Sequence, residues 1–187
     1  GAAVAVIHEG RIILERGYGR ADIARDTPIT PATRFYIGSV SKQFTAAAIA
    51  LLARQGKLSL DDDMRKFVPE LPDYGQPITV RQLIHHTSGL RDYLALRAAA
   101  GEPEDGTFGD DDVLALLRRQ RALNFAPGTQ HLYSNSGYFL LSVIVRRVSG
   151  QSLRAFADGA IFRPLGMAGA LFRDDHTALL PDRAHGY

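Results

Sequence analysis

The sequence predicts an α+β fold in which a short antiparallel hairpin precedes a long, mainly helical region. Three observations support this prediction. Two short apolar runs flank a Glu-Gly pair near the start, several later segments carry apolar residues at helical spacing, and most proline and glycine residues lie between these segments. With 187 residues, the chain can form one domain with a sizeable core, or one domain and part of another.

The composition excludes several classes of function. Hydrophobic residues make up 45% and charged residues 22%, the ordinary balance of a globular protein. A formal net charge of +2 is too small to indicate a nucleic-acid partner. The chain has no cysteine, so disulfides and zinc–thiolate sites are excluded. No apolar run is long enough to span a bilayer.

The predicted hairpin occupies the first twenty residues. Residues 4–7 and 12–14 are apolar, and Glu9-Gly10 between them forms a typical hairpin turn. Threonine–proline pairs at 27–28 and 30–31 then predict a loop. Because a lone hairpin is marginally stable in water, it needs further strands or a helix to pack on.

Helices are expected in the rest of the chain. The first runs from about residue 39 to 55 and ends at Gly56, and a capping box at 79–82 starts a short helix toward residue 85. Residues 98–109 are interpreted as a loop. Three aspartates at 110–112 open a helix to residue 121. Two more helices follow: one over about 136–148 that Gly150 caps, and one from Ser152 that ends before Pro164.

One candidate nucleophile stands at the start of the first helix. Ser39 and Lys42 are three residues apart, so on a helix they share one face. At a helix start the Ser39 N–H is unsatisfied and can point toward a developing oxyanion. Such a Ser-x-x-Lys spacing also arises by chance about once in a chain of this length. An N-cap serine beside a surface lysine therefore remains the alternative.

A second candidate is the segment of Tyr133 and Asn135, which follows a Pro-Gly turn and precedes a helix. A phenol can transfer a proton, and an amide can hold a substrate carbonyl. The alternative is a core tyrosine beside a helix cap. The pair His85-His86 and the run Asp61–Asp63 are interpreted as a helix end and a helix start, because neither has the spacing of a metal site.

Taken together and in this order, the motifs resemble the serine β-lactamase-related family, which includes class C β-lactamases, penicillin-binding proteins, D-alanyl-D-alanine carboxypeptidases, D-aminopeptidases and esterases. The resemblance covers nearly the whole chain. It rests on residues 35–42 (FYIGSVSK), 56–62 (GKLSLDD), 78–90 (ITVRQLIHHTSGL), 125–128 (FAPG), 133–138 (YSNSGY) and 164–167 (PLGM).

The resemblance implies a β-lactamase/transpeptidase-like fold, an antiparallel sheet flanked by helices, of which residues 1–187 form a partial domain. Residues 1–38 would supply the hairpin and lead-in, and residues 39–187 the helical region. It implies that Ser39 is acylated, that Lys42 and Tyr133 share the proton transfers, and that Asn135 binds substrate or orients Lys42. The implied substrate is an amide, ester or β-lactam, with no cofactor and no metal. A non-catalytic binding protein on the same fold is the alternative.

The sequence departs from the family in one motif. A Lys-Thr-Gly or His-x-Gly motif is expected on a strand after the helical region, but His185-Gly186 lacks the intervening residue. We therefore expect C-terminal strands to be missing and this fragment alone to be a poor or inactive enzyme. We also expect the hairpin edge to pair with another copy of the chain or with a C-terminal segment. The family suggests a periplasmic or secreted protein whose leader is not in this chain.

Overall fold

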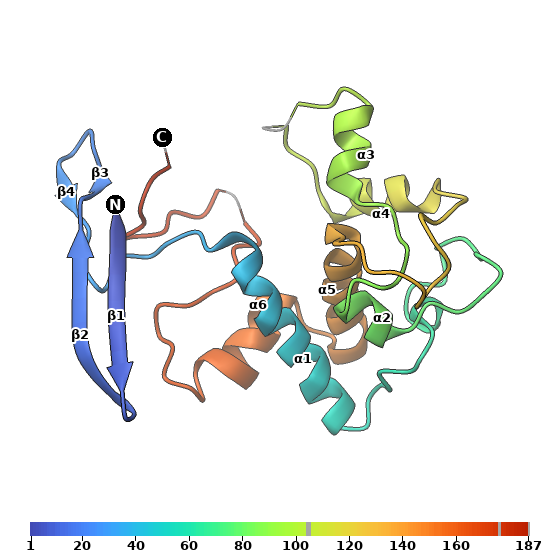
Figure 1. The fold of residues 1–187 in the computed structure, drawn as a ribbon, viewed down its shortest axis with the longest axis horizontal. Helices are drawn as coiled ribbons and strands as arrows, with labels where there is room; N and C mark the ends of the chain where they lie inside the picture. Colours follow the sequence, from blue (N-terminus) through green and yellow to red (C-terminus); the bar gives the residue numbers. More distant parts are fainter. Residues whose placement is uncertain (104–105, 176, 187) are drawn as a thin grey trace.

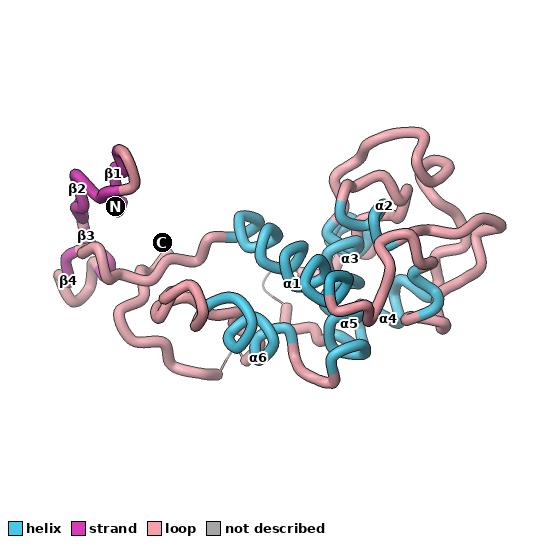
Figure 2. Tube along the Cα trace, turned by 90° about the horizontal axis from the view of Figure 1, so that it is seen from below, coloured by secondary structure: helices cyan, strands magenta, loops and turns pink. Residues whose placement is uncertain are grey.

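The computed structural model describes residues 1–103, 106–175 and 177–186. Short strands lie at one side of the molecule and the helices at the other, and the two views agree on this separation (Figures 1 and 2). The predicted α+β order of a hairpin followed by helices is therefore confirmed.

The first hairpin joins β1 (Ala2–His8) to the antiparallel β2 (Arg11–Tyr18). Its turn is made by Glu9 and Gly10, both with positive φ, at 48° and 74°. Two positive φ values match the turn type whose twist suits a two-residue hairpin. The sequence prediction of this turn is confirmed.

A second, smaller pairing was not predicted. Strands β3 (Arg20–Asp22) and β4 (Thr27–Pro28) form a short antiparallel ladder where we expected a loop. The Asp22 carboxylate closes the turn between them, because it accepts a hydrogen bond from the Arg25 N–H at 3.0 Å. Strands of three and two residues leave no alternation of apolar residues to recognise in the sequence.

The helical region has a core of its own. Its elements are η1 (Gly38–Ser41), α1 (Lys42–Arg54), η2 (Met64–Lys66), α2 (Val80–Ile84), α3 (Tyr93–Ala99), α4 (Asp110–Arg118), α5 (Asn135–Ser149), α6 (Leu153–Ala157) and the π-helical turn η3 (Asp158–Phe162). Helix α5 packs against α1, α2 and α6. The fully buried side chains at this centre include Ile49, Leu52, Leu83, Leu140 and Ile144.

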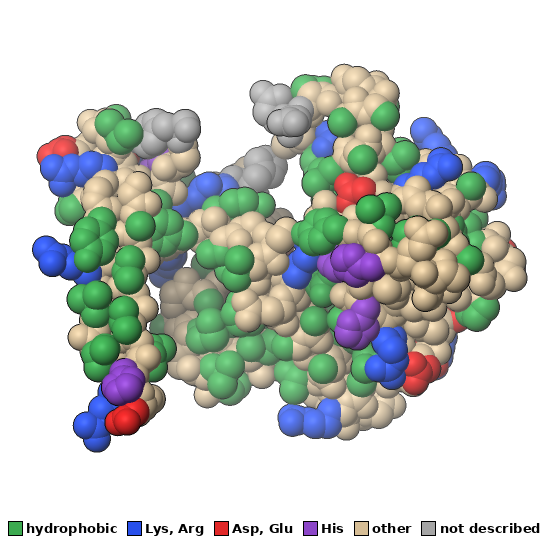
Figure 3. Space-filling view, in the orientation of Figure 1, with side chains coloured by type: hydrophobic (Ala, Val, Ile, Leu, Met, Phe, Trp, Pro, Cys, Tyr) green, Lys and Arg blue, Asp and Glu red, His purple; other side chains and the backbone are tan. Residues whose placement is uncertain are grey.

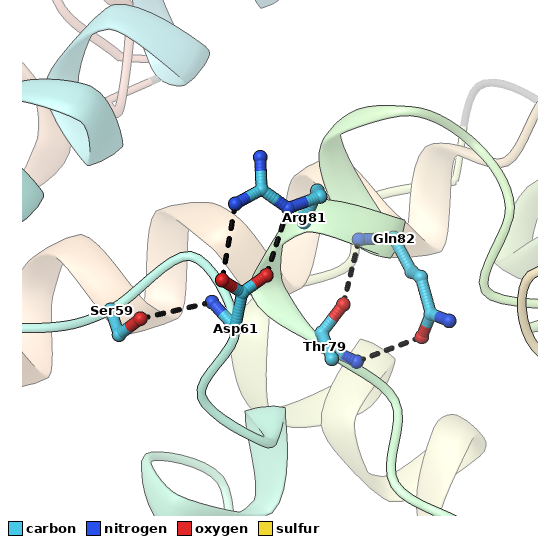
Figure 4. A network of polar contacts seen from close by, with 5 residues as sticks. All are labelled: Ser59, Asp61, Thr79, Arg81 and Gln82. Atoms are coloured by element: carbon cyan, nitrogen blue, oxygen red, sulfur yellow. Dashed lines mark hydrogen bonds and ion pairs between the residues drawn. The ribbon is translucent and has the colours of Figure 1, made fainter.

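Several helix ends follow from local chemistry. Gly56 and Gly150 take positive φ values of 69° and 73°, as expected for residues that close α1 and α5. The predicted capping box is present, because Thr79 Oγ1 accepts from the Gln82 N–H at 3.2 Å and Gln82 Oε1 accepts from the Thr79 N–H at 2.9 Å (Figure 4). Helix α4 ends at Arg118, three residues earlier than predicted, and α3 was not predicted.

The hairpin contributes nothing to this core. Its apolar side chains stay exposed on both faces, with 67% of Ile7 and 64% of Ile13 accessible. The space-filling view shows these apolar side chains along the hairpin surface (Figure 3). Within the described residues, no helix is both long enough and apolar enough to cross a bilayer.

Candidate active site

The Ser39 side chain lies at the junction between an extended lead-in and the first long helix. Gly38 precedes it with a φ of 51°, a left-handed conformation that glycine adopts at little cost. The turn η1 then delivers the chain into α1. In the described part of the chain, no backbone or side-chain acceptor takes the Ser39 N–H, whereas the next N–H, of Val40, bonds to the Ile37 carbonyl at 3.1 Å.

Two side chains converge on the Ser39 hydroxyl. Lys42 Nζ donates to Ser39 Oγ at 2.9 Å, and the Tyr133 hydroxyl donates to the same oxygen at 2.5 Å. The first contact follows from the three-residue spacing along one helix face. The second joins residues 94 positions apart, and it depends on the packing of α5 against α1. The structure thus brings together the serine, lysine and tyrosine that the sequence singled out.

The Lys42 ammonium is held from a second side. It donates to Asn135 Oδ1 at 3.0 Å, and it lies 4.9 Å from the ring centroid of Tyr133 and 5.5 Å from that of Tyr138. A cation over aromatic faces is attracted by the ring quadrupole. The amine is therefore fixed between one amide oxygen, one hydroxyl and two rings.

The environment of Tyr133 favours its ionised form. Burial raises the pKa of the phenol, but the hydrogen bonds to Lys42 and Ser39 and the charge of Lys42 outweigh that effect, so the pKa lies below its usual range. A phenol with a lowered pKa is a better proton acceptor near neutral pH than a free tyrosine.

Asn135 is oriented by an aspartate that sequence reasoning missed. Asp92 Oδ2 accepts from the Asn135 backbone N–H at 2.5 Å and from its Nδ2 at 2.9 Å. The other oxygen, Oδ1, caps α3 by accepting from the N–H groups of Leu94 and Ala95 at 2.9 and 3.2 Å. An aspartate before an apolar segment is an N-cap signal, but α3 itself was not predicted.

His86 also contacts the site, in addition to the role in the helix end that we expected. It follows α2 with a φ of 57°, and its Nδ1 accepts from the buried backbone N–H of Ser134 at 3.1 Å. Its ring stacks on Tyr133 with centroids 4.5 Å apart and planes 29° apart. Only the tertiary fold reveals this contact, because the partners are 47 and 48 residues away.

The other predicted features lie away from Ser39 and have structural roles. Asp63 caps η2, since it accepts from the Arg65 N–H at 2.9 Å, as expected for a helix start. Asp61 forms an ion pair with Arg81 through two hydrogen bonds of 2.8 and 3.2 Å (Figure 4). The His185 N–H donates to the Ala21 carbonyl at 2.8 Å, so the His-Gly pair lies beside β3.

The chain resembles known proteins along its whole length. The Beta-lactamase family model matches residues 1–187. The D-aminopeptidase of Gluconobacter oxydans is 35% identical over 189 residues, which cover 100% of this chain and 35% of that protein. The chain thus spans about a third of the length of this relative.

Solved structures share this fold. The D-amino acid amidase from Ochrobactrum anthropi, complexed with D-phenylalanine, matches with a TM-score of 0.83 and 28% identity, over 99% of this chain and 51% of the amidase. The octameric penicillin-binding protein homologue from Pyrococcus abyssi matches with a TM-score of 0.78 and 34% identity, over 88% of this chain and 39% of that chain. With a β-lactamase/transpeptidase-like fold and a family match that covers every residue, the chain belongs to the Beta-lactamase family.

Proposed function

We propose that residues 1–187 form part of one β-lactamase-like domain and carry the nucleophile of a serine hydrolase. Ser39 would form an acyl-enzyme with an amide, ester or β-lactam. One observation carries this proposal: the Ser39 hydroxyl accepts hydrogen bonds from both Lys42 Nζ and the Tyr133 hydroxyl, at 2.9 and 2.5 Å. A serine needs such neighbours to act as a nucleophile at neutral pH.

In the proposed reaction, Tyr133 acts as its phenolate. The phenol oxygen then no longer donates to Ser39 Oγ but accepts from it, and it takes the Ser39 proton as Ser39 Oγ attacks the substrate carbonyl. The carbonyl electrons move onto the substrate oxygen, which the Ser39 N–H stabilises as one oxyanion donor. When the intermediate collapses, the bond to the leaving group breaks, and the leaving group takes the proton from Tyr133. Water then attacks the acyl-enzyme by the same route and restores the free serine.

Lys42 and Asn135 support this proton transfer. The Lys42 ammonium lies beside the Tyr133 ring and bonds to Ser39, so it stabilises the phenolate electrostatically. Asn135 accepts a hydrogen bond from Lys42, and Asp92 in turn holds Asn135 through two N–H groups. We therefore propose that Asn135 orients the Lys42 side chain and, as a second role, contacts the acyl side chain of the substrate.

Among the possible substrates, we rank amides of D-amino acids first. Two relatives are described as a D-aminopeptidase and a D-amino acid amidase, at 35% and 28% identity. β-Lactams and esters acylate a serine by the same chemistry. The side chains that line the substrate pocket determine which of the three substrate classes is bound. Since this chain spans about a third of its D-aminopeptidase relative, we expect it to react poorly by itself.

Covalent labelling tests the nucleophile. The native gene product and the 187-residue chain are treated with a fluorophosphonate, a fluorescent penicillin and a D-phenylalanine amide, and the adduct is located by mass spectrometry. Labelling at Ser39 that disappears in Ser39→Ala and persists in the control Ser142→Ala supports the proposal. Ser142 is matched because it lies on α5 and donates only to the Phe139 carbonyl in the described structure. Adduct formation that survives Ser39→Ala refutes it.

The pattern of labelling separates the remaining candidates. Turnover of the D-amino acid amide supports the amidase assignment. Reaction with the fluorophosphonate but not with penicillin or the amide indicates an esterase. A correctly folded native gene product that none of the three reagents modifies indicates a non-catalytic binding protein on this fold.

We also propose that the outer edge of the hairpin pairs with a second copy of the chain. In the described sheets, β1 and β2 pair only with each other, and their apolar side chains are exposed. Unpaired edges of this kind are templates for another strand, and the Pyrococcus abyssi homologue is described as octameric. Sedimentation velocity of the wild-type chain and of Val4→Lys tests this: a wild-type oligomer that dissociates in the variant supports edge pairing, and a monomeric wild type refutes it.

A further inference from the structure

We propose that His86 is a positioning residue for Tyr133 and that it acts only while its imidazole is neutral. This inference rests on the proposed function, because it concerns how Tyr133 is aimed at Ser39. His86 lies two residues after the last residue of α2, and Tyr133 lies on the segment that leads into α5. Three contacts from the one histidine reach this segment.

Backbone contacts bracket the tyrosine. The His86 carbonyl accepts from the Leu132 N–H at 3.0 Å, and its Nδ1 accepts from the Ser134 N–H at 3.1 Å. Leu132 and Ser134 are the residues on either side of Tyr133. With both neighbours tied to one residue, the backbone at Tyr133 has little freedom to rotate, so the direction of its side chain is set.

Ring stacking sets the plane of the phenol. The imidazole lies against the Tyr133 ring at 4.5 Å, and the Tyr133 hydroxyl contacts Ser39 Oγ at 2.5 Å. Offset stacking of this kind restrains a ring that is otherwise open, since 45% of Tyr133 is exposed. The histidine therefore restrains both the backbone and the side chain of the group that touches the reacting oxygen.

The hydrogen bond requires one protonation state. An imidazole nitrogen accepts only when it carries no proton, so Nδ1 must be bare and the proton must lie on Nε2. Protonation at acidic pH converts Nδ1 into a donor that faces the Ser134 N–H. The hydrogen bond is then lost, and only the Leu132 side of Tyr133 stays bound to the backbone of His86.

The surroundings disfavour that protonation at neutral pH. The titratable groups that face His86 are His85 beside it, His131 and Tyr133 on the opposite loop, Lys42 on α1 and Tyr138 on α5. Burial lowers the pKa of His86 below its usual range, and the charges of His131 and Lys42 lower it further. The imidazole is thus neutral at pH 7 and becomes charged only in acid.

Two substitutions of His86 distinguish its role as a hydrogen-bond acceptor from its role as a stacked ring. His86→Asn offers Oδ1 as an acceptor near the position of Nδ1, tolerates the positive φ of 57°, and cannot titrate. His86→Phe keeps an aromatic face against Tyr133 but has no acceptor for the Ser134 N–H. The matched control is His8→Asn, at an exposed histidine of the hairpin.

The test measures the rate of Ser39 fluorophosphonate labelling in the native gene product from pH 4.5 to 8. For wild type we expect the rate to fall in acid, with a midpoint below the usual histidine pKa. His86→Asn should lose the part of this fall that follows the titration of His86 and keep any part that follows the titration of Tyr133. His86→Phe should react about tenfold to a hundredfold more slowly at every pH, as expected for a misplaced proton acceptor. His8→Asn should behave as wild type.

Other outcomes overturn the inference. His86→Asn with an unchanged acid limb, or His86→Phe with the wild-type rate, shows that His86 does not position Tyr133. Nitrogen-15 NMR gives an independent readout, because a histidine that carries its proton on Nδ1 at pH 7 refutes the acceptor role. If wild type is not labelled at Ser39 while the NMR shows a bare Nδ1, the proposed function fails but the His86–Ser134 contact stands.

Discussion

Replacing Gly89 with alanine is expected to disturb the site through the backbone. Gly89 is buried, has a φ of 74°, and its carbonyl accepts from the Asn124 N–H at 2.8 Å. A Cβ built on it collides with the carbonyl oxygen of Phe125. The segment that contains Phe125 continues into Tyr133, so a displacement there is passed toward Ser39.

The magnitude follows from two separate costs. An alanine at positive φ is disfavoured by about 1 to 2 kcal/mol, partly offset because alanine restricts the unfolded chain by about 0.4 to 1 kcal/mol. Overpacking against a fixed backbone adds about 1 to 3 kcal/mol. Gly56 isolates the first cost, since its φ is 69° and nothing lies within 4 Å of its would-be Cβ. We therefore expect about 1 kcal/mol for Gly56→Ala and about 2 to 4 kcal/mol for Gly89→Ala.

Urea denaturation followed by circular dichroism measures both variants against wild type. The difference between Gly89→Ala and Gly56→Ala reports the collision with Phe125 alone. Gly89→Ala should also label more slowly at Ser39 in conditions where it is fully folded, and Gly56→Ala should not. Equal losses of stability in the two variants would show that the backbone of Phe125 does not hinder a side chain at residue 89, and would refute the prediction.

Three further predictions concern the site and the core. Asp92→Asn leaves fewer acceptors for Asn135 and should slow Ser39 acylation about tenfold to a hundredfold with little change in KM, as steady-state kinetics would show. Ultraviolet titration should find a tyrosinate that forms below the usual tyrosine pKa and is absent in Tyr133→Phe, because Lys42 and Ser39 lower the pKa of that phenol. Ile144→Ala should cost about 2 to 5 kcal/mol in denaturation, because that side chain is fully buried; a cost below 1 kcal/mol would contradict its place in the core.

Sequence reasoning predicted the elements whose signals are local. The Glu9-Gly10 turn, the capping box of Thr79 and the glycine ends at 56 and 150 each need only a few neighbouring residues, and all are present. Helix α3 was missed, since its seven residues span two turns and expose most of one side. The pairing of β3 with β4 was missed because strands of three and two residues carry no readable alternation.

In the candidate site, too, local contacts could be predicted from the sequence and long-range contacts could not. Ser39 and Lys42 could be paired from their spacing on one helix. Tyr133 and Asn135 could be singled out from their own segment, but only the resemblance to a family linked them to Ser39 and Lys42. Their contacts with Ser39 and Lys42 cross 94 and 93 residues. His86 could be read only as a helix end, because a hydrogen bond to a backbone N–H 48 residues away leaves no mark on the local sequence.

These long separations have a consequence for folding. The contacts that surround Ser39 close loops of more than ninety residues, so they form only after α1 and α5 have docked. A compact intermediate with intact helices and loose packing would hold the serine and the lysine together but leave the tyrosine unplaced. During refolding, the moment at which Ser39 becomes reactive would therefore report when tertiary packing is complete. Ser39 reactivity should recover later than the circular dichroism signal of the helices.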